Sequence, residues 1–436
     1  AADAAAAVAL ALAVVEPYSS GLGGGGFALI RMGKELNFID FRETAPERAG
    51  REMYIENGVP NPLSSRDGIR SVAIPGAVAG YLELQERYGK LERREVLAPA
   101  IALARDGFRV TTRYQDYVGW RLELLRRDPE LCRIFLIRDE HGDWVSPQLG
   151  HTIIQSDLTN TLTELAEKGA SAFYTGAIAD KLARDMQERG GLITSGDLES
   201  YRVRYRKPMV GSYRGRTIVS SPPPSSGGQI LLTLLNILET RAAPSHWRDP
   251  EFVHLYIEAS KRAFADRALL GDPDFLPYLP KLLSHLVAKD RAELLSQVID
   301  GHATLAHTIP AAQGSALPID VPRKGPAPFS AGTDTSHLSI IDSEGNAVAM
   351  TTTVNYGWGS GIVAKGTGVI WNDEMDDFAV APGVPNAYGI VGSDANAVQP
   401  GKVPLSSMSP TMMFRGNETE GTLELVVGSP GGSRIP

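Results

Sequence analysis

The chain has 436 residues, of which 43% are hydrophobic and 22% charged, so disorder over the whole chain is excluded. Its 43 Lys and Arg against 51 Asp and Glu give a net charge of −8, and no basic cluster indicates a nucleic-acid surface. Cys132 is the only cysteine, which excludes an intramolecular disulfide and a zinc–thiolate site.

Helical patterns dominate the first two thirds of the chain. Ala4–Val15 is an apolar run shorter than the roughly 20 residues that a membrane-spanning helix needs. Asp3 precedes it and no basic segment does, so a buried helix fits better than a signal peptide. The other expected helices are Gly76–Tyr88, Arg94–Asp106, Thr161–Lys168, Ile178–Arg189, Gln229–Glu239 and Glu251–Arg267.

Strand patterns occur early in the chain and again after a change in composition. The early ones are Phe27–Arg31, Asn37–Phe41 and Thr217–Ser220. Residues 310–334 are rich in Pro and Gly, which is typical of a mobile linker. A hairpin of 336–342 and 347–354 follows directly, and Thr422–Val427 predicts a further strand.

Thr335 stands where the linker meets the hairpin. A hydroxyl nucleophile needs a base, and an N-terminal threonine supplies its own, because an α-amine has a pKa of about 7.7–8.0. This chemistry requires cleavage after Asp334. The alternative is an ordinary β-branched residue at the start of a strand.

Several motifs, in order and spacing, resemble the γ-glutamyltranspeptidases. The motifs are Glu16–Phe27, Phe38–Pro46, Pro222–Gly228, Thr335-Ser-His337, Asn355, Asn372–Phe378, Pro404–Pro410 and Ser429–Arg434. The resemblance covers essentially the whole chain. It also leads us to expect a fragment, since family members have a helix and strand before Ala1 and continue well past Gly432.

The resemblance implies an α/β fold, the four-layer αββα sandwich of the N-terminal-nucleophile hydrolases. It also implies a precursor that cuts itself between Asp334 and Thr335. Residues 1–334 would form a helix-rich large subunit ending in the linker, and residues 335–436 a β-rich small subunit.

The same resemblance implies a donor site and a nucleophile. Arg42 would hold the donor α-carboxylate with Ser406 and Ser407, while Asn355, Glu374 and Asp377 would accept from the ammonium. Taken alone, Arg42 could instead form a surface ion pair with Asp40 or Glu43. Glu374 and Asp377, taken alone, could belong to a solvated acidic turn.

Four further residues complete the implied site. Gly431 and Gly432 would donate two backbone N–H groups to the oxyanion, although a bare Gly-Gly pair is also typical of a turn. Thr353 would hydrogen-bond the nucleophile, or be an ordinary strand residue. Tyr388 would close over the donor from a loop, Ala381–Pro400, and bond to Asn355.

Other candidates are weaker. Gly23–Gly26 lacks the strand and Lys-Ser/Thr of a phosphate loop and indicates a packing turn. His254 and Glu258 share a helix face, but no third metal ligand is evident and Glu258 can pair with Arg262. His337 is expected to support its strand rather than act as a base.

The sequence therefore predicts a γ-glutamyl hydrolase/transferase that acts on glutathione and related compounds through an ester on Thr335, with water, amino acids or dipeptides as acceptors. No cofactor or metal is expected, and the resemblance implies a periplasmic or secreted location. The alternatives are a glutaryl or cephalosporin acylase on the same fold, or an unprocessed, inactive relative that binds amino acids.

Overall fold

The computed structural model describes residues 1–304, 309, 311, 334–381 and 383–436. The helices of the described residues are α1 (Ala2–Val15), α2 (Pro62–Arg66), α3 (Ala77–Tyr88), α4 (Arg93–Asp106), α5 (Thr112–Leu125), α6 (Pro129–Phe135), α7 (Ser156–Lys168), α8 (Ser171–Tyr174), α9 (Ala177–Glu188), α10 (Ser195–Ser200), α11 (Gly227–Glu239), α12 (Pro250–Asp266), α13 (Leu279–Leu286) and α14 (Lys289–Gln297).

The longer strands of the described residues are β1 (Gly25–Met32), β2 (Glu35–Asp40), β9 (Arg204–Arg206), β10 (Met209–Tyr213), β11 (Arg216–Ser220), β12 (Ser336–Ile341), β13 (Ala347–Thr353), β16 (Thr411–Arg415) and β17 (Thr422–Val427). The two-residue strands are β3 (Ile55–Glu56), β4 (Val59–Pro60), β5 (Phe108–Arg109), β6 (Ile137–Arg138), β7 (Trp144–Val145), β8 (Thr152–Ile153), β14 (Val363–Ala364) and β15 (Val369–Ile370).

Two antiparallel sheets form the centre of the molecule. The first has the order β12-β13-β1-β2-β9 and the second β10-β11-β16-β17. In the first sheet, β1 pairs with β13 so that Gly25 lies opposite Thr353. The hairpin of β12 and β13 therefore joins the early strands of the chain, and brings the start of β12 to the same end of the sheet as Thr353.

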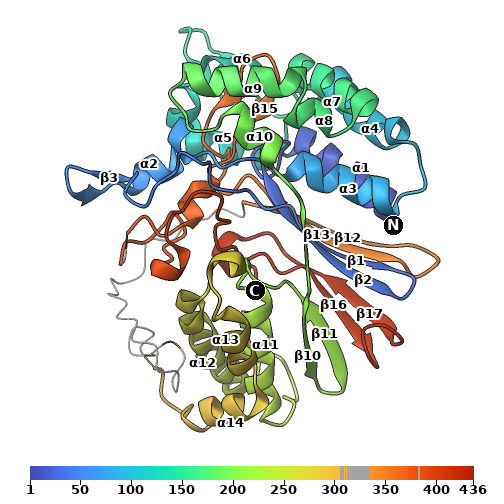
Figure 1. The fold of residues 1–436 in the computed structure, drawn as a ribbon, viewed down its shortest axis with the longest axis vertical. Coiled ribbons are helices and arrows are strands. Elements are labelled where there is room, and N and C mark those ends of the chain that lie inside the picture. The colour runs from blue at the N-terminus through green and yellow to red at the C-terminus, as the bar shows by residue number, and fades with distance from the viewer. Residues whose placement is uncertain (305–308, 310, 312–333, 382) are drawn as a thin grey trace.

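Helices cover the outer face of each sheet, which gives the expected four αββα layers (Figure 1). Helices α1 and α3 pack on the first sheet and α11 packs on the second. Apolar side chains fill the space between the sheets, including Phe27 and Phe38 from the first and Met412 from the second. The site must therefore be built where the strands end and loops replace this apolar packing.

Helix α1 shows why an alanine-rich run forms a buried helix. Alanine has the highest helix propensity, and its small side chain lets neighbouring helices approach closely. Ala5, Ala6 and Ala9 are fully buried, and α1 contacts both α3 and α4. The run is thus part of the core, as predicted.

All seven predicted helices and the predicted strands are present, with ends that differ by a few residues. The predicted linker of residues 310–334 lies almost wholly outside the described residues. Helices α5, α6, α13 and α14 and strands β10 and β16 were not predicted. In α5 the Thr111 cap and the buried Tyr114, Tyr117 and Val118 carry a helical period that could have revealed it.

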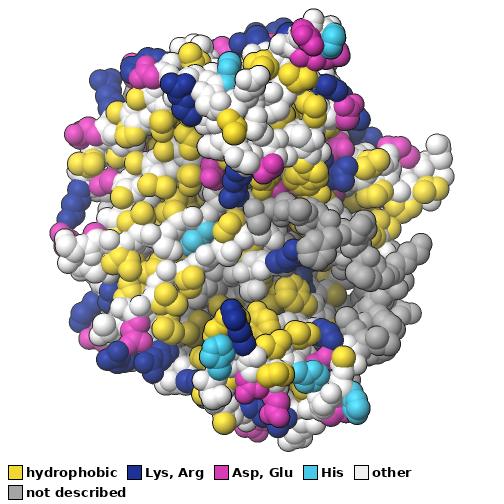
Figure 2. Space-filling model, turned by 180° about the vertical axis from the view of Figure 1, so that it is seen from behind, with side chains coloured by type: hydrophobic (Ala, Val, Ile, Leu, Met, Phe, Trp, Pro, Cys, Tyr) yellow, Lys and Arg dark blue, Asp and Glu magenta, His cyan; other side chains and the backbone are white. Residues whose placement is uncertain are grey.

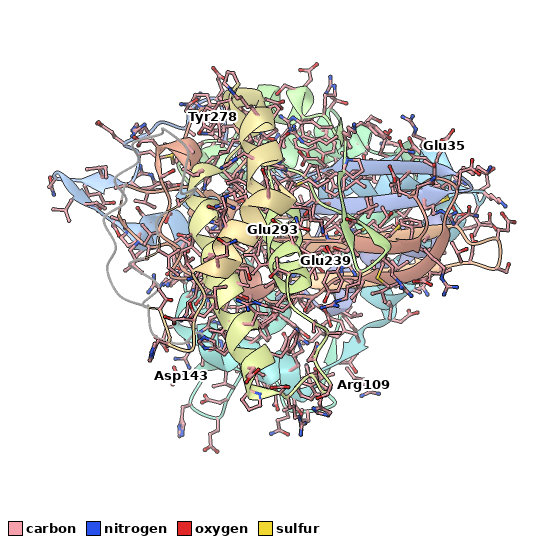
Figure 3. All side chains as sticks on the ribbon, turned by 90° about the horizontal axis from the view of Figure 1, so that it is seen from below. Glu35, Arg109, Asp143, Glu239, Tyr278 and Glu293 are labelled. Carbon is pink, nitrogen blue, oxygen red and sulfur yellow. The ribbon has the colours of Figure 1, made fainter. Side chains whose placement is uncertain are left out.

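Charged side chains of both signs are interspersed on the face that Figure 2 shows, without a large field of one sign. Exposed residues such as Glu35, Arg109 and Asp143 lie at the periphery (Figure 3). Across the described residues, none of the helices combines the length and the apolar character that a membrane crossing requires.

Candidate active site at Thr335

Thr335 lies immediately before β12 and is 3% exposed. Its hydroxyl donates to the carbonyl oxygen of Asp334, the residue before it. Thr353, at the end of β13, donates to the same carbonyl at 3.2 Å, and its Oγ1 lies 3.3 Å from Thr335 Oγ1. The pairing of β12 with β13 thus places two hydroxyls at one peptide carbonyl.

Asn355 fixes the position of the Thr353 hydroxyl. Its backbone N–H donates to Thr353 Oγ1 at 2.9 Å, and its side-chain amide donates to the carbonyl of Asp373 at 3.0 Å. Asn355 has φ of 74°, a left-handed conformation that asparagine tolerates better than most residues. This local strain turns the chain away from β13 and into the pocket.

The Asp334 side chain is fully buried beside the nucleophile. Burial raises the pKa of its carboxyl group to about 7, and a hydrogen bond from Tyr117 on α5 opposes that rise. The uncut chain therefore keeps a carboxyl group in a site that disfavours its charge.

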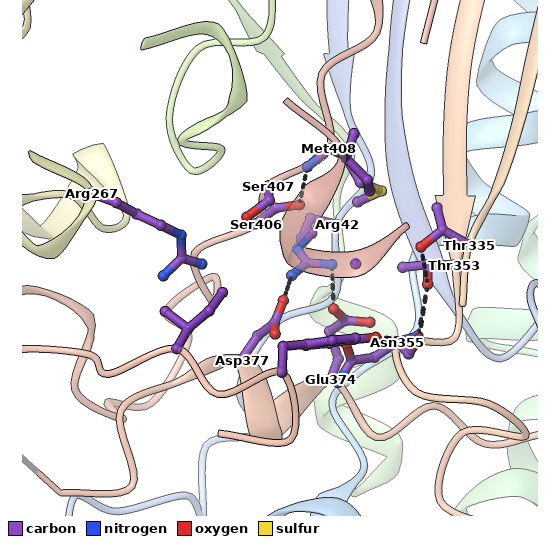
Figure 4. A pocket seen from close by; sticks show the side chains of 14 residues that line it. Arg42, Arg267, Thr335, Thr353, Asn355, Glu374, Asp377, Ser406, Ser407 and Met408 are labelled. Atoms are coloured by element: carbon purple, nitrogen blue, oxygen red, sulfur yellow. Dashed lines mark hydrogen bonds and ion pairs between the residues drawn. The ribbon is translucent and has the colours of Figure 1, made fainter. Parts of the chain in front are cut away.

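A pocket opens beside Thr335 and collects most of the predicted site residues (Figure 4). It is lined by Arg42, Arg267, Thr335, Thr353, Asn355, Glu374, Asp377, Tyr388, Ile390, Ser406, Ser407, Met408, Gly432 and Ile435. Gly431 is adjacent to this lining but is not part of it. The free space is about 20 Å³, near the room that one water needs, so side chains must move before a donor enters.

Arg42 is the buried cation of the pocket, with 1% of its surface exposed. Its guanidinium forms ion pairs with Glu374 and Asp377, and lies 3.9 Å from Glu43. The interpretation as a surface ion pair is therefore wrong, and Asp40 instead pairs with Arg206.

The acidic residues that face Arg42 are not a solvated turn, because Glu374 is fully buried. Burial raises the pKa of Glu374 well above its usual value, and it raises that of Glu43 to about 7, while Arg42 opposes both shifts. Burial lowers the pKa of Arg42, but Glu374 and Asp377 raise it overall. Arg42 thus stays charged, and burial disfavours the charged forms of both glutamates.

The Ser406 segment is held by the start of α11. The backbone N–H and hydroxyl of Ser226 both donate to the Ser406 carbonyl at 2.9 Å, and the Ser225 hydroxyl donates to the Met408 carbonyl at 2.6 Å. A Cβ at Gly227 would contact Ser409 at 2.6 Å, so only glycine permits this close approach. The Pro222–Gly228 motif therefore supports the site without lining it.

Tyr388 lines the pocket and makes the predicted bond to Asn355. Its hydroxyl donates to the backbone carbonyl of Asn355 at 2.9 Å, and burial raises the pKa of its phenol, which therefore stays protonated. Gly432 has φ of 56°, and a Cβ there would overlap the Tyr388 ring. Glycine at this position thus allows the ring to lie against the backbone of residue 432.

The weaker candidates have structural explanations. Glu258 pairs with Arg262 and Lys261, and His254 bonds to the carbonyl of Asp300, while the described residues contain no metal-binding cluster. His337 bonds to Thr351 at 2.8 Å and so joins the two strands. Cβ atoms at Gly23 would overlap the backbone of β15, which fits a packing turn.

Sequence reasoning missed four lining residues, namely Arg267, Ile390, Met408 and Ile435. Ile390 and Met408 lie within two residues of predicted ones, so their neighbours could have suggested them. Arg267 ends a helical pattern far from the other motifs, and nothing local in the sequence indicates it.

Comparison with known proteins gives one consistent result. The family model described as gamma-glutamyltranspeptidase matches residues 1–436. The glutathione hydrolase proenzyme of Pseudomonas aeruginosa is 42% identical over 99% of this chain and 73% of its own. The glutathione hydrolase proenzyme of Escherichia coli is 41% identical, and the match covers 99% of this chain and 71% of that protein.

Solved structures agree with this. Cephalosporin acylase from Bacillus halodurans has a TM-score of 0.81 at 26% identity, covering 100% of this chain and 74% of that one. Helicobacter pylori gamma-glutamyltranspeptidase has a TM-score of 0.68 at 35% identity, and the match covers 73% of this chain and 90% of that one. From its sequence and its fold, the chain belongs to the gamma-glutamyltranspeptidase family.

Proposed function

We propose that this protein is a γ-glutamyl hydrolase/transferase that cleaves the γ-glutamyl amide of glutathione and related compounds with Thr335 as nucleophile. The observation that carries the proposal is the contact of the Thr335 hydroxyl with the Asp334 carbonyl, with Thr353 hydrogen-bonded to both. The relatives named glutathione hydrolase proenzyme support the same activity and a processed precursor.

Maturation begins at that contact. Thr335 Oγ1 adds to the Asp334 carbonyl carbon, the C–N bond breaks, and the nitrogen keeps the hydroxyl proton as an amine. Water then hydrolyses the resulting ester, which leaves a carboxylate on Asp334 and a free amine on Thr335. Thr353 donates a hydrogen bond to the carbonyl oxygen on which negative charge develops. Cleavage would therefore place residues 1–334 in a large subunit and residues 335–436 in a small subunit.

The new amine serves as the base of the catalytic cycle. It takes the proton of Thr335 Oγ1 as this oxygen attacks the γ-carbonyl of the donor, and then gives the proton to the leaving amine. Gly431 and Gly432 donate backbone N–H groups to the oxyanion. Water resolves the γ-glutamyl ester to glutamate, whereas an amino acid or dipeptide gives a new γ-glutamyl compound.

The donor head group is a zwitterion, and the pocket has matching groups. Arg42, Ser406 and Ser407 take the α-carboxylate, and Asn355, Glu374 and Asp377 take the ammonium. In the uncut chain Arg42 is paired with the same two acidic residues. A bound donor would therefore replace these pairs within the pocket by two new ones, between Arg42 and its carboxylate and between the acidic residues and its ammonium. This exchange favours donors that carry both charges.

A cephalosporin or glutaryl acylase is the second candidate, favoured by the TM-score of 0.81 to such an enzyme. A glutaryl group has no ammonium and would leave the acidic residues of the pocket without a ligand. The ring of Tyr388 over Gly432 also restricts the room for a bulky acyl group. Both features support the γ-glutamyl donor.

We also propose a periplasmic or secreted location, as the family resemblance implies. No cofactor or metal takes part in this proposal, because the threonine amine, its hydroxyl and the backbone N–H groups supply the base, the nucleophile and the oxyanion donors.

The direct test is to trap the ester. The matured protein is mixed with γ-glutamyl-p-nitroanilide, quenched in acid and digested, and the peptide that begins at Thr335 is analysed by mass spectrometry. We expect one γ-glutamyl group on Thr335 and burst release of nitroaniline. A modified residue elsewhere, or faster turnover of the glutaryl anilide, would contradict the proposal.

A further inference from the structure

Arg267 is a second guanidinium at the pocket, and the proposed mechanism leaves it without a role. It follows directly on α12, from the helical layer of the second sheet. Figure 4 shows Arg267 on one side of the pocket and Thr335 on the other, with Arg42, Ser406 and Ser407 between them. Arg267 therefore lies across the pocket from the nucleophile.

The two arginines differ in their partners. Arg42 has ion pairs with two carboxylates and lies near a third. Arg267 is 5% exposed, and its Nη2 donates to the backbone carbonyl of Leu405 at 3.1 Å. Its Nε is buried without a hydrogen-bond partner, and no ion pair joins it to a carboxylate in the described part of the chain. Arg267 thus carries a positive charge that no ion pair neutralises among the residues the structure describes.

A buried cation without a counter-ion is costly, so its retention beside a pocket indicates an anionic ligand. Burial, which Asp377 partly opposes, lowers the pKa of Arg267 to about 10, so the group remains charged at neutral pH. The Ser407 hydroxyl, also buried and without a hydrogen-bond partner, lines the same pocket. The unused donors of Arg267 and Ser407 both favour a carboxylate.

We propose that Arg267 is a specificity-determining residue, whose charge makes the pocket select acyl donors that carry an α-carboxylate. This inference rests on the proposed function and adds a residue to its donor site. Arg42 provides hydrogen-bond geometry, but its charge is largely cancelled by its ion pair with Asp377. Arg267 supplies the net positive potential that the cancelled charge of Arg42 lacks.

A merely structural role is the competing explanation, because the bond from Arg267 to Leu405 also holds the segment that leads to Ser406. A misplaced Ser406 segment would weaken every donor alike. If Arg267 acts through its charge, kcat/KM should fall only for donors that have a carboxylate. The two roles therefore differ in donor selectivity rather than in activity.

Three anilides separate these outcomes. γ-Glutamyl-p-nitroanilide has both charges, the glutaryl anilide keeps only the carboxylate, and the 4-aminobutyryl anilide keeps only the ammonium. The matured wild type and Arg267→Met are compared by kcat/KM, or by the inhibition constant for an anilide that is not turned over. We expect roughly a tenfold or larger loss for the two carboxylate donors and less than a threefold change for the third.

Arg267→Lys keeps the charge but loses the planar fork, and tests the proposal if the methionine variant does not mature. We expect about a threefold loss that is still confined to the carboxylate donors. Arg291→Met is the control for the loss of a buried arginine, since Arg291 is equally buried and bonds to the Leu286 carbonyl at 3.1 Å, but it is ion-paired with Asp266 and does not line the pocket. The ratios of kcat/KM between the three anilides should be the same in Arg291→Met as in the wild type. An equal loss for all three donors in either Arg267 variant, or no loss, would overturn the proposal.

The design also separates this proposal from the proposed function. If the wild type hydrolyses none of the anilides, the proposed function fails, but calorimetry with L-glutamate and 4-aminobutyrate still tests Arg267. Tighter binding of L-glutamate that Arg267→Met abolishes would support the carboxylate role. Equal binding of both compounds by the wild type and the variant would overturn it.

Discussion

The pocket at Thr335 and the core between the two sheets lie side by side but are built on opposite principles. The core is apolar: the rings of Phe27 and Phe38 are tilted relative to each other, with their centroids 5.5 Å apart, and both side chains are almost fully buried. The pocket buries Arg42, Arg267 and Glu374, whose charges each cost free energy to desolvate. We infer that the core stabilises the fold, while the pocket uses part of that stability to present charges to a substrate.

Replacing Arg42 should have the largest effect, and on activity. We propose that Arg42 makes two charge-assisted hydrogen bonds to the donor carboxylate, so Arg42→Gln should lower kcat/KM for γ-glutamyl-p-nitroanilide about a thousandfold. Arg206→Gln is the control, because Arg206 is also an ion-paired, largely buried arginine but lies outside the pocket lining. A similar loss in both variants would show that Arg42 acts through folding alone.

Replacing Phe27 should affect stability and leave the pocket chemistry unchanged. Phe27→Ala opens a cavity between the sheets, and we expect it to lower the free energy of unfolding by about 3 kcal/mol. Urea unfolding of the uncut Thr335→Ala protein measures this in a single chain. Val210→Ala, at a residue that is 41% exposed, should change it by less than about 0.5 kcal/mol. If Phe27→Ala instead raised the donor KM of the matured enzyme, the division between core and pocket would fail.

Asp334 lies on the boundary between the two regions, and its effect depends on pH. Its folded pKa is raised to about 7, above the usual value near 3.9 of an unfolded chain. The precursor therefore loses stability as the pH rises from about 4 to 7 and recovers none above that. Because asparagine cannot ionise, Asp334→Asn in the Thr335→Ala background should stabilise the precursor by about 2 kcal/mol more at pH 8 than at pH 5.

Thermal unfolding at the two pH values measures this difference. Thr335→Ala with Asp334 intact is the reference at each pH, which removes the contribution of every other titrating group. An equal gain at pH 5 and pH 8 would mean that burial does not raise the pKa of Asp334.

Replacing Tyr388 should have the smallest effect. Tyr388→Phe removes one hydrogen bond to the Asn355 carbonyl, worth about 1 kcal/mol, and should raise the donor KM roughly fivefold with little change in kcat. Tyr114→Phe loses an equivalent bond to the Phe135 carbonyl, away from the pocket, and should leave the KM unchanged. An unchanged KM in Tyr388→Phe would exclude a role of this hydroxyl in holding the donor.

Local patterns in the sequence predicted the helices and strands, whereas the family resemblance predicted the four-layer fold and most residues of the candidate site. The alanine-rich run of α1 and the strand–turn–strand pattern of β12 and β13 need only neighbouring residues. Arg42, Thr335 and Ser406 were predicted from the family resemblance, since each lies in a continuous motif.

What the sequence did not reveal depends on contacts between distant segments. Arg267 meets the carbonyl of Leu405 across 138 positions, and no local pattern predicts such a contact. The pairing of Arg42 with both Glu374 and Asp377, instead of solvent, likewise appears only in the folded chain. Long-range charge pairing was therefore the part that required the structure.

Intact mass and N-terminal sequencing after incubation near pH 8, for the wild type and Thr335→Ala, would show whether Thr335 cuts the chain. We expect the wild type to give one chain that begins Thr-Ser-His-Leu and a partner that ends at Asp334. We expect Thr335→Ala to stay uncut. A wild type that remains one chain, or a Thr335→Ala protein that is still cut at this bond, would contradict self-cleavage by Thr335.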